Sequence, residues 1–163
     1  MSWWVRSVRD MQWRANELGS TVDFDYDVDH FDEFGINLTV LEPGQSMTMY
    51  HRERYQEGFL LLRGESLLIV EGQEVPMKQW DYFHCPPDVP HAIVGAGQGT
   101  CLVLAVGNRV GPDVILYPRD ETALKHSAGV EQETPSPHEA YAPFGHWRLG
   151  RPDAWRDLPW ARD

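Results

Sequence analysis

The sequence has few basic residues, few cysteines and no long apolar run. Its 163 residues include 14 lysines and arginines against 25 aspartates and glutamates, a formal net charge of −11. Proteins that coat nucleic acid or anionic membranes need a basic face, so we expect neither partner. No run of about 18 apolar residues occurs, which argues against a membrane-spanning helix.

The scarcity of cysteine also restricts the class of protein. Cys85 and Cys101 are the only two cysteines, and they do not form a CxxC pair. Isolated cysteines are typical of small buried thiols in a reducing compartment. The first residues contain no apolar segment of signal-peptide length. We therefore expect a cytoplasmic protein without a disulfide.

Length and composition indicate one globular domain over residues 1–163. Hydrophobic residues make up 42% and charged residues 24% of the chain, both near the averages for globular proteins. We find no internal repeat. Residues 36–107 are rich in short apolar runs, whereas residues 1–35 and 108–163 are irregular extensions. We expect these extensions to pack on the core or on a partner subunit.

The apolar runs of residues 36–107 are bounded by glycine, proline or aspartate. Short strands with turn signals every 8–12 residues or so are typical of an all-β sandwich or barrel. No helix of ordinary length fits this region. The predicted strands are 36–41, 47–51, 59–62, 66–70, 80–85, 92–94 and 101–106.

The extensions contain three features of note. Residues 22–30 alternate apolar and acidic side chains, but Val28 and Phe34 stand where a calcium loop needs glycine and glutamate. We therefore predict a strand with a solvated acidic face. A short helix is expected at 120–125 with Asp120 as its N-cap. Six tryptophans in the extensions are expected to cover the barrel, its mouth or a second subunit, and a homodimer is expected.

Four acidic and imidazole residues carry the main chemical signal. His51 and Glu53 are two residues apart, so a strand places them on one face. Glu57 begins the next predicted strand, which a hairpin would bring back beside them. His91 follows the proline-rich segment 86–90. Each residue alone reads as an ordinary surface group, but together they predict a site for Mn, Fe, Zn or Ni.

The spacing of these residues resembles the first motif of the cupin family. That motif has a glycine, a His-x-His pair, a glutamate and a second glycine. Here six residues separate Glu57 from Gly64, and three separate Glu53 from Glu57. His51 and Glu53 therefore occupy the two histidine positions. Gly44 lies one residue further upstream than the strict pattern.

A second segment is similar to the second cupin motif. Pro86 and His91 match the proline and the histidine of that motif. Trp80 occupies the first glycine position, while Asp88 and Gly95 replace a glycine and an asparagine. The resemblance covers about residues 36–107.

The resemblance implies an all-β, antiparallel barrel of the double-stranded β-helix or jelly-roll type. It also implies a divalent metal held by His51, Glu57 and His91. Glu53 in place of a histidine would make the site more anionic, which leans toward Mn or Fe(II). Alternatively, Glu53 points away, and water or Gln56 completes the coordination.

Further side chains are predicted to line the cavity. Alternation along the strand places Met47, Met49 and Tyr55 on the same side as His51, and Phe59 and Leu61 on the side of Glu57.

In the strand over residues 80–85, either Tyr82 and His84 or Phe83 and Cys85 face inward. His84 and Tyr55 are the candidate catalytic residues. His84 would act as a general acid or base, with an ordinary pKa near 6.5, or would be a partly buried, hydrogen-bonded histidine.

The family resemblance implies a metal-binding cupin that takes a small-molecule ligand. We expect an enzyme with oxygenase- or isomerase-type chemistry at the His/Glu-bound metal. The alternative is a non-catalytic module that binds a small ligand or metal. A third possibility is an inactive barrel whose extensions form an assembly interface. Fold alone does not decide among them.

Overall fold

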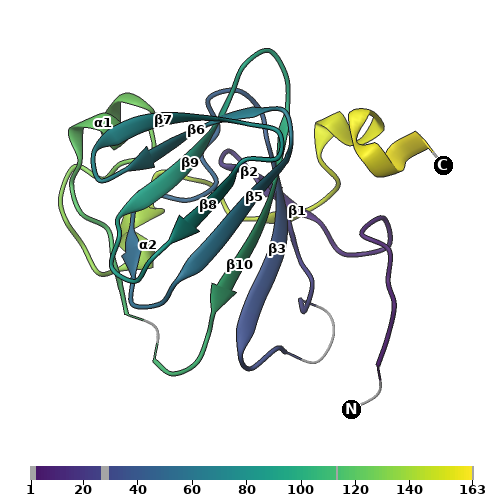
Figure 1. Cartoon of the computed structure of the whole chain (residues 1–163), viewed down its shortest axis with the longest axis horizontal. Helices are drawn as coiled ribbons and strands as arrows, with labels where there is room; N and C mark the ends of the chain where they lie inside the picture. The colour runs from purple at the N-terminus through teal and green to yellow at the C-terminus, as the bar shows by residue number, and fades with distance from the viewer. Residues whose placement is uncertain (1–2, 27–29, 113, 163) are drawn as a thin grey trace.

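The protein, described by a computed structural model over residues 3–26, 30–112 and 114–162, is built mainly of β-strands (Figure 1). The strands are β1 (Arg14–Asn16), β2 (Gly19–Asp23), β3 (Phe34–Leu41), β4 (Arg52–Glu53), β5 (Glu57–Arg63), β6 (Glu65–Val70), β7 (Gln73–Lys78), β8 (Tyr82–Cys85), β9 (His91–Ala96), β10 (Cys101–Asn108), β11 (Ile115–Leu116) and β12 (Arg148–Leu149). The helices are α1 (Glu121–Lys125), α2 (Pro137–Ala140) and the 3₁₀ turns η1 (Asp153–Asp157) and η2 (Pro159–Arg162). No described helix has the length and apolar character needed to cross a membrane.

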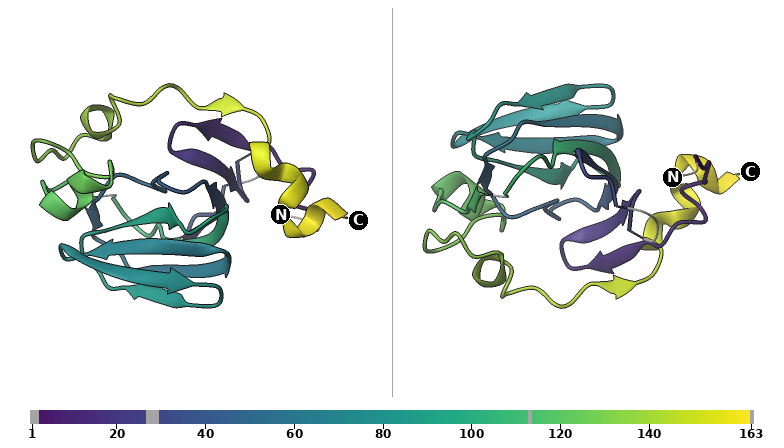
Figure 2. Two further views of the ribbon diagram at one scale, coloured as in Figure 1. Left: turned by 90° about the horizontal axis from the view of Figure 1, so that it is seen from above. Right: turned by 90° about the horizontal axis from the view of Figure 1, so that it is seen from below.

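The strands form two main antiparallel sheets. The larger has the order β12-β1-β2-β3-β10-β5-β8, and the smaller has the order β7-β6-β9. Strands β11 and β4 form a separate two-stranded sheet. In both views of Figure 2, the β1–β2 hairpin and the C-terminal turns lie on one side of the barrel strands, away from β6 and β7. The expected all-β barrel is confirmed.

Alternation of side chains along the strands explains the core. In β5, Phe59 and Leu61 are buried, whereas Leu60 and Leu62 face the other side of the sheet. Full burial of such a side chain contributes roughly 1.5–3 kcal/mol. The core cluster comprises Leu41, Phe59, Leu61, Leu68, Met77, Cys85, Ile93, Cys101, Val103 and Ala105. Both cysteines are free and buried, as predicted.

Five of the seven predicted strands are confirmed. Segments 36–41, 59–62, 66–70, 92–94 and 101–106 lie within β3, β5, β6, β9 and β10. The predicted strand at 80–85 is confirmed over its last four residues, which form β8. The predicted strand at 47–51 is wrong, because only isolated bridges join its region to β9, at Ser46–Val94 and His51–His91.

Strand β7 was missed by the sequence analysis. It pairs with β6 through a two-residue turn in which Glu71 and Gly72 have φ angles of 49° and 73°. Positive φ at both central residues is the signature of a type I′ hairpin turn. The Glu-Gly pair is a weaker signal for this turn than Asn-Gly, and Met77 is the only buried residue of β7.

The extensions match their predictions unevenly. Helix α1 is confirmed, with the Asp120 carboxylate accepting hydrogen bonds from the backbone of Thr122 and Ala123. The strand predicted at 22–30 ends at Asp23, and residues 27–29 lie outside the described residues. Asp25 is only 6% exposed, so the solvated acidic face is wrong at that position.

Two residues in glycine positions of the second motif have left-handed backbones. Trp80 has φ 76° and Asp88 has φ 64°. Glycine adopts such angles without steric cost, whereas other residues do so rarely. The tight turns of this barrel are therefore retained although the glycines are replaced.

A close approach between two backbone segments makes Gly95 a test of the fold. A Cβ at position 95 would collide with the carbonyl group of Glu42. We expect Gly95→Ala to lower the free energy of unfolding by about 1–3 kcal/mol, as overpacking does. Urea unfolding followed by circular dichroism measures the change. Gly99 has no atom within 4 Å of an added Cβ, so Gly99→Ala should stay within about 0.5 kcal/mol of the wild type. Equal losses in both variants would contradict this reading.

Candidate metal centre

Two histidines face each other across neighbouring chain segments. His51 and His91 form an antiparallel bridge in which each backbone N–H donates to the other's carbonyl, over 3.1 and 2.8 Å. Residues directly opposite in such a pair project to the same face. Their ring centroids are 4.9 Å apart, and the two residues are 4% and 2% exposed.

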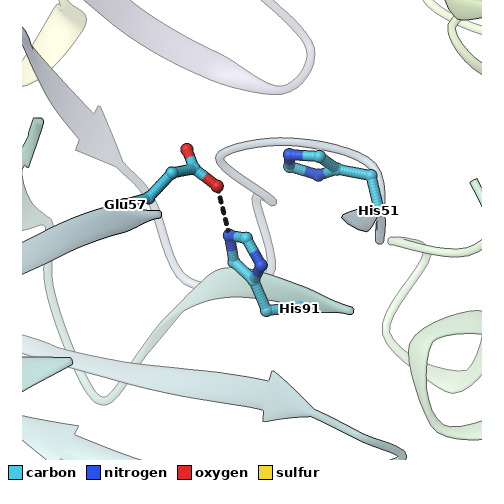
Figure 3. A group of neighbouring side chains, drawn as sticks. All are labelled: His51, Glu57 and His91. Carbon is cyan, nitrogen blue, oxygen red and sulfur yellow. Dashed lines mark ion pairs between the residues drawn. The ribbon is translucent and has the colours of Figure 1, made fainter. Parts of the chain in front are cut away.

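A carboxylate from the larger sheet meets the two imidazoles. Glu57 is the first residue of β5 and lies between Cys85 of β8 and Gly107 of β10. Its Oε2 atom lies 3.4 Å from Nε2 of His91 (Figure 3). One ligand atom from each of His51, Glu57 and His91 lies within 4.8 Å of the others. The structure thus brings together three of the four predicted metal ligands.

Glu53, the fourth predicted ligand, lies beside this group. Its Oε1 atom is 3.3 Å from Nε2 of His51. The hydrogen bond with His51 lowers the pKa of Glu53 against the opposing effect of burial, so this side chain is a carboxylate at neutral pH. Whether Glu53 binds a metal directly stays a prediction.

The backbone sets the tautomer of both histidines. Nδ1 of His51 lies 2.7 Å from the carbonyl oxygen of Met49, and Nδ1 of His91 lies 3.1 Å from that of Val89. Because a carbonyl can only accept, each Nδ1 carries the proton. The ring of His91, whose pKa is lowered, then presents the lone pair of Nε2 to the centre, which is the arrangement of metal-binding histidines. Nε2 of His51 does the same once it has lost the proton that it shares with Glu53.

The neutral state of the His91 ring explains why a metal cation fits between His91 and Glu57. Burial and the charge of His51 lower the pKa of His91 to about 4, so its ring is neutral at pH 7. Its Nε2 lone pair then faces the Glu57 carboxylate, an unfavourable pairing unless a cation lies between them. Two imidazoles and a carboxylate are donors that suit Fe(II), Mn, Zn or Ni. The donor set of these residues therefore fits a divalent metal.

A cavity of about 360 Å³ opens beside the carboxylates. It exists because the side chains that face inward become smaller toward this end of β3 and β10. Leu41 and Val103 fill the core, whereas Gly35, Ala105 and Gly107 line the cavity. The remaining lining residues are Asn37, Glu53, Tyr55, Glu57, Asn108, Arg109 and Gly111.

The comparisons with known proteins agree with this architecture. The family model described as Cupin domain matches residues 37–107. Residues 37–107 are a cupin domain. No curated protein matches the chain in sequence.

Solved structures show the same fold. A sugar phosphate isomerase of the cupin superfamily from Silicibacter pomeroyi is 20% identical, with a TM-score of 0.62 over 72% of this chain and 88% of that one. The polyketide cyclase RemF from Streptomyces resistomycificus is 19% identical, with a TM-score of 0.58 over 69% and 84%. A predicted oxalate decarboxylase from Thermotoga maritima is 21% identical, with a TM-score of 0.55 over 64% and 98%.

The structure separates the two candidate catalytic residues of the cupin domain. Tyr55 lines the cavity, and its hydroxyl donates to the carbonyl oxygen of Pro112 over 3.4 Å; its catalytic role stays a prediction. His84 is exposed and pairs with Gly58, on the face of the sheet opposite to Glu57. The expectation that His84 acts at the metal is wrong, because the β5–β8 register turns it outward.

The register of β8 also decides which neighbours face inward. Phe83 and Cys85 belong to the core, whereas Tyr82 is 63% exposed. Burial raises the pKa of the Cys85 thiol to about 12. Cys85 is therefore a protonated packing residue, although its Sγ lies 3.3 Å from Nδ1 of His91.

The C-terminal extension supplies a wall of the site that sequence reasoning missed. The Tyr117 ring centroid lies 5.9 Å from that of His51, and the Tyr141 hydroxyl accepts from the backbone N–H of Met49 over 3.2 Å. Met49 packs with Tyr117 and Ala140 rather than in the barrel, so its predicted inward position is wrong. Period-two alternation fails there because the segment is not a regular strand.

The pH dependence of metal affinity tests the role of Glu53. Burial lowers the pKa of His51, but the hydrogen bond with Glu53 and the charge of Glu57 outweigh it, so the pKa lies above its ordinary 6.5. Metal and proton compete for Nε2. We expect affinity to fall as pH drops through this raised pKa, by up to about tenfold per pH unit. In Glu53→Gln the fall should begin at a lower pH.

Calorimetric titration of Mn²⁺ into both proteins at several pH values measures this shift. Glu74 offers a matched control, because its carboxylate also pairs with a histidine, His126, but outside the centre. Glu74→Gln should leave the affinity profile unchanged. A Glu53→Gln profile that coincides with that of the wild type would show that Glu53 does not stabilise the competing proton on His51.

Proposed function

We propose that this cupin is a metal-dependent enzyme that acts on a small molecule by oxygenase- or isomerase-type chemistry. The observation that carries the proposal is the convergence of His51, Glu57 and His91 within 4.8 Å beside an open cavity. Two histidines and one carboxylate with open positions are the ligand set of many non-haem Fe(II) oxygenases. The structural neighbours include an isomerase, a cyclase and a predicted decarboxylase, so the fold supports several reactions.

The side chains around the centre have distinct tasks in this proposal. A bound divalent metal would supply Lewis acidity and, if redox-active, electron transfer. The Glu53 carboxylate lines the cavity and is ionised at neutral pH, so it is the group placed to accept a proton from the substrate. Phe59 and Phe83 pack on the ring of His91 and keep water from its inner side. Tyr55 offers a hydroxyl at the cavity wall.

Turnover distinguishes an enzyme from a module that only binds. Protein loaded with Fe(II) or Mn²⁺ is incubated with diols, keto acids, phenols and sugars, and oxygen consumption and NMR spectra of the mixtures are recorded. We expect oxygen uptake or isomerised product with at least one class, and loss of that activity in Glu57→Gln. Arg63→Ala is the control, because Arg63 hydrogen-bonds the backbone of Asp157 away from the cavity. Ligand binding without turnover in any class would favour the non-catalytic alternative.

We include the expected homodimer and cytoplasmic location in this proposal. Phe34, Tyr82 and Val106 leave apolar surface exposed on the larger sheet, at 43%, 63% and 39%. Contiguous exposed apolar surface is typical of an interface. Sedimentation velocity should give the mass of two chains; a monomer at micromolar concentration would contradict the dimer.

A further inference from the structure

The one cationic side chain among the described residues of the cavity wall, Arg109, is held by a buried carboxylate. Arg109 follows β10, and its Nη1 donates to Oδ2 of Asp25 over 2.6 Å. The Asp25 side chain is 4% exposed, against 34% for that of Arg109. The same Oδ2 accepts the backbone N–H of Phe31 over 3.1 Å. Asp25 thus binds the guanidinium group at Nη1.

The other edge of the guanidinium is left available to a ligand. Among the described residues, no acceptor takes a hydrogen bond from Nε or Nη2 of Arg109. These two N–H groups form the fork that binds a carboxylate or phosphate through two parallel hydrogen bonds. A Cβ at position 35 would lie 2.6 Å from Nε, 2.7 Å from Nη2 and 2.8 Å from Cζ of Arg109, so the guanidinium group packs directly against the backbone of Gly35. Only glycine allows the guanidinium group to pack this closely, and both residues line the cavity.

The other residues that line the cavity indicate what a ligand must carry besides a negative charge. Asn37 and Asn108 offer neutral amides, which hydrogen-bond hydroxyl groups as donors and acceptors. Glu53 and Glu57 supply two negative charges that a divalent cation would balance. Arg109 is the one cation among the described lining residues, so it is the group that selects for ligand charge.

We propose that the cavity binds a small hydroxylated molecule with a carboxylate or phosphate group, and that Arg109 holds this oxyanion through Nε and Nη2. The inference rests on the proposed function, because it names the substrate class of the same site. The hydroxylated part of the molecule extends from the oxyanion toward Glu57. Asp25 is a positioning residue that fixes the orientation of the guanidinium.

Three matched six-carbon probes test the proposal: sorbitol, gluconate and sorbitol 6-phosphate. Calorimetric titrations into metal-free and Mn²⁺-loaded protein compare a neutral ligand with a carboxylate and a phosphate. We expect at least one anion to bind about tenfold or more tightly than sorbitol, as a charge-assisted bidentate contact allows. The anion that binds better identifies the oxyanion.

The Arg109→Gln variant should lose this preference in both forms of the protein. A preference caused only by the metal would remain in Arg109→Gln and disappear from the metal-free protein. Arg119→Gln is the matched control, because Arg119 also pairs with a carboxylate, that of Glu121, but outside the cavity. Arg109→Lys keeps the charge beside Asp25 and removes the fork, so it should lose most of the preference even if Arg109→Gln folds poorly.

The outcomes separate this inference from the proposed function. Equal binding of sorbitol and both anions, or an anion preference unchanged in Arg109→Gln and Arg109→Lys, overturns the role of Arg109. Mn²⁺ uptake, followed by electron paramagnetic resonance, is read independently in the same samples. Absence of Mn²⁺ uptake would overturn the proposed function, while the preference of the metal-free protein would still report on Arg109.

Discussion

His91→Ala is expected to abolish metal binding. Loss of a partner that merely orients a ligand typically costs ten- to a hundredfold in affinity, so loss of the ligand itself should cost at least about a hundredfold. His91 lies at the point where the smaller sheet meets Glu57, and no other described imidazole besides His51 reaches this group. Metal content per chain after dialysis, and Mn²⁺ titration followed by electron paramagnetic resonance, measure the loss.

His84→Ala is the control for this experiment. It removes the same side chain seven positions earlier, from the outward face of β8. It should keep the full metal content of the wild type. Circular dichroism of both variants checks that the barrel has formed. Stoichiometric metal in a folded His91→Ala protein would refute the assignment of the centre.

Trp13→Ala is expected to lower the free energy of unfolding by about 3–5 kcal/mol, as other buried tryptophan truncations do. Trp13 is 3% exposed. Its ring centroid lies 5.8 Å from that of Trp155 and 5.7 Å from that of Trp160. The cluster packs on Leu38 and Leu102 of the larger sheet. The truncation therefore weakens the attachment of both extensions to the barrel at once.

Urea unfolding, with the midpoint and the slope fitted separately, measures this loss. Trp3→Ala is the matched control, because Trp3 is 90% exposed; it should change stability by no more than about 0.5 kcal/mol. A loss below about 1 kcal/mol in Trp13→Ala would show that the extensions contribute little to stability.

The tryptophans show how much of the packing of the extensions could be predicted from composition. Their concentration in the extensions predicted that these segments cover something, and Trp13, Trp155 and Trp160 cover the outer face of β3 and β10. Composition could not separate them from Trp3 and Trp80, which are 90% and 67% exposed. Burial of a single ring depends on which strand it meets, and that is a property of the assembled sheets.

The register of β8 also could not be predicted from the sequence alone. Sequence alternation states only that Tyr82 and His84 share one face and Phe83 and Cys85 the other. Pairing of His84 with Gly58, and of Cys85 with Glu57, selects the second pair for the core. The choice depends on hydrogen bonds to a strand more than twenty residues away, so no local pattern contains it.

The sequence by itself determined the barrel and the positions of His51, Glu57 and His91. Strand alternation, turn residues and motif spacing are local properties of the chain, and they remain readable without a structure. Tertiary structure decided the rest of the site, because its contacts join distant residues. Tyr141 reaches Met49 across 92 positions, and Arg109 reaches Asp25 across 84. Such pairs form only when the extensions fold onto the barrel, and they leave no periodic signal in the sequence.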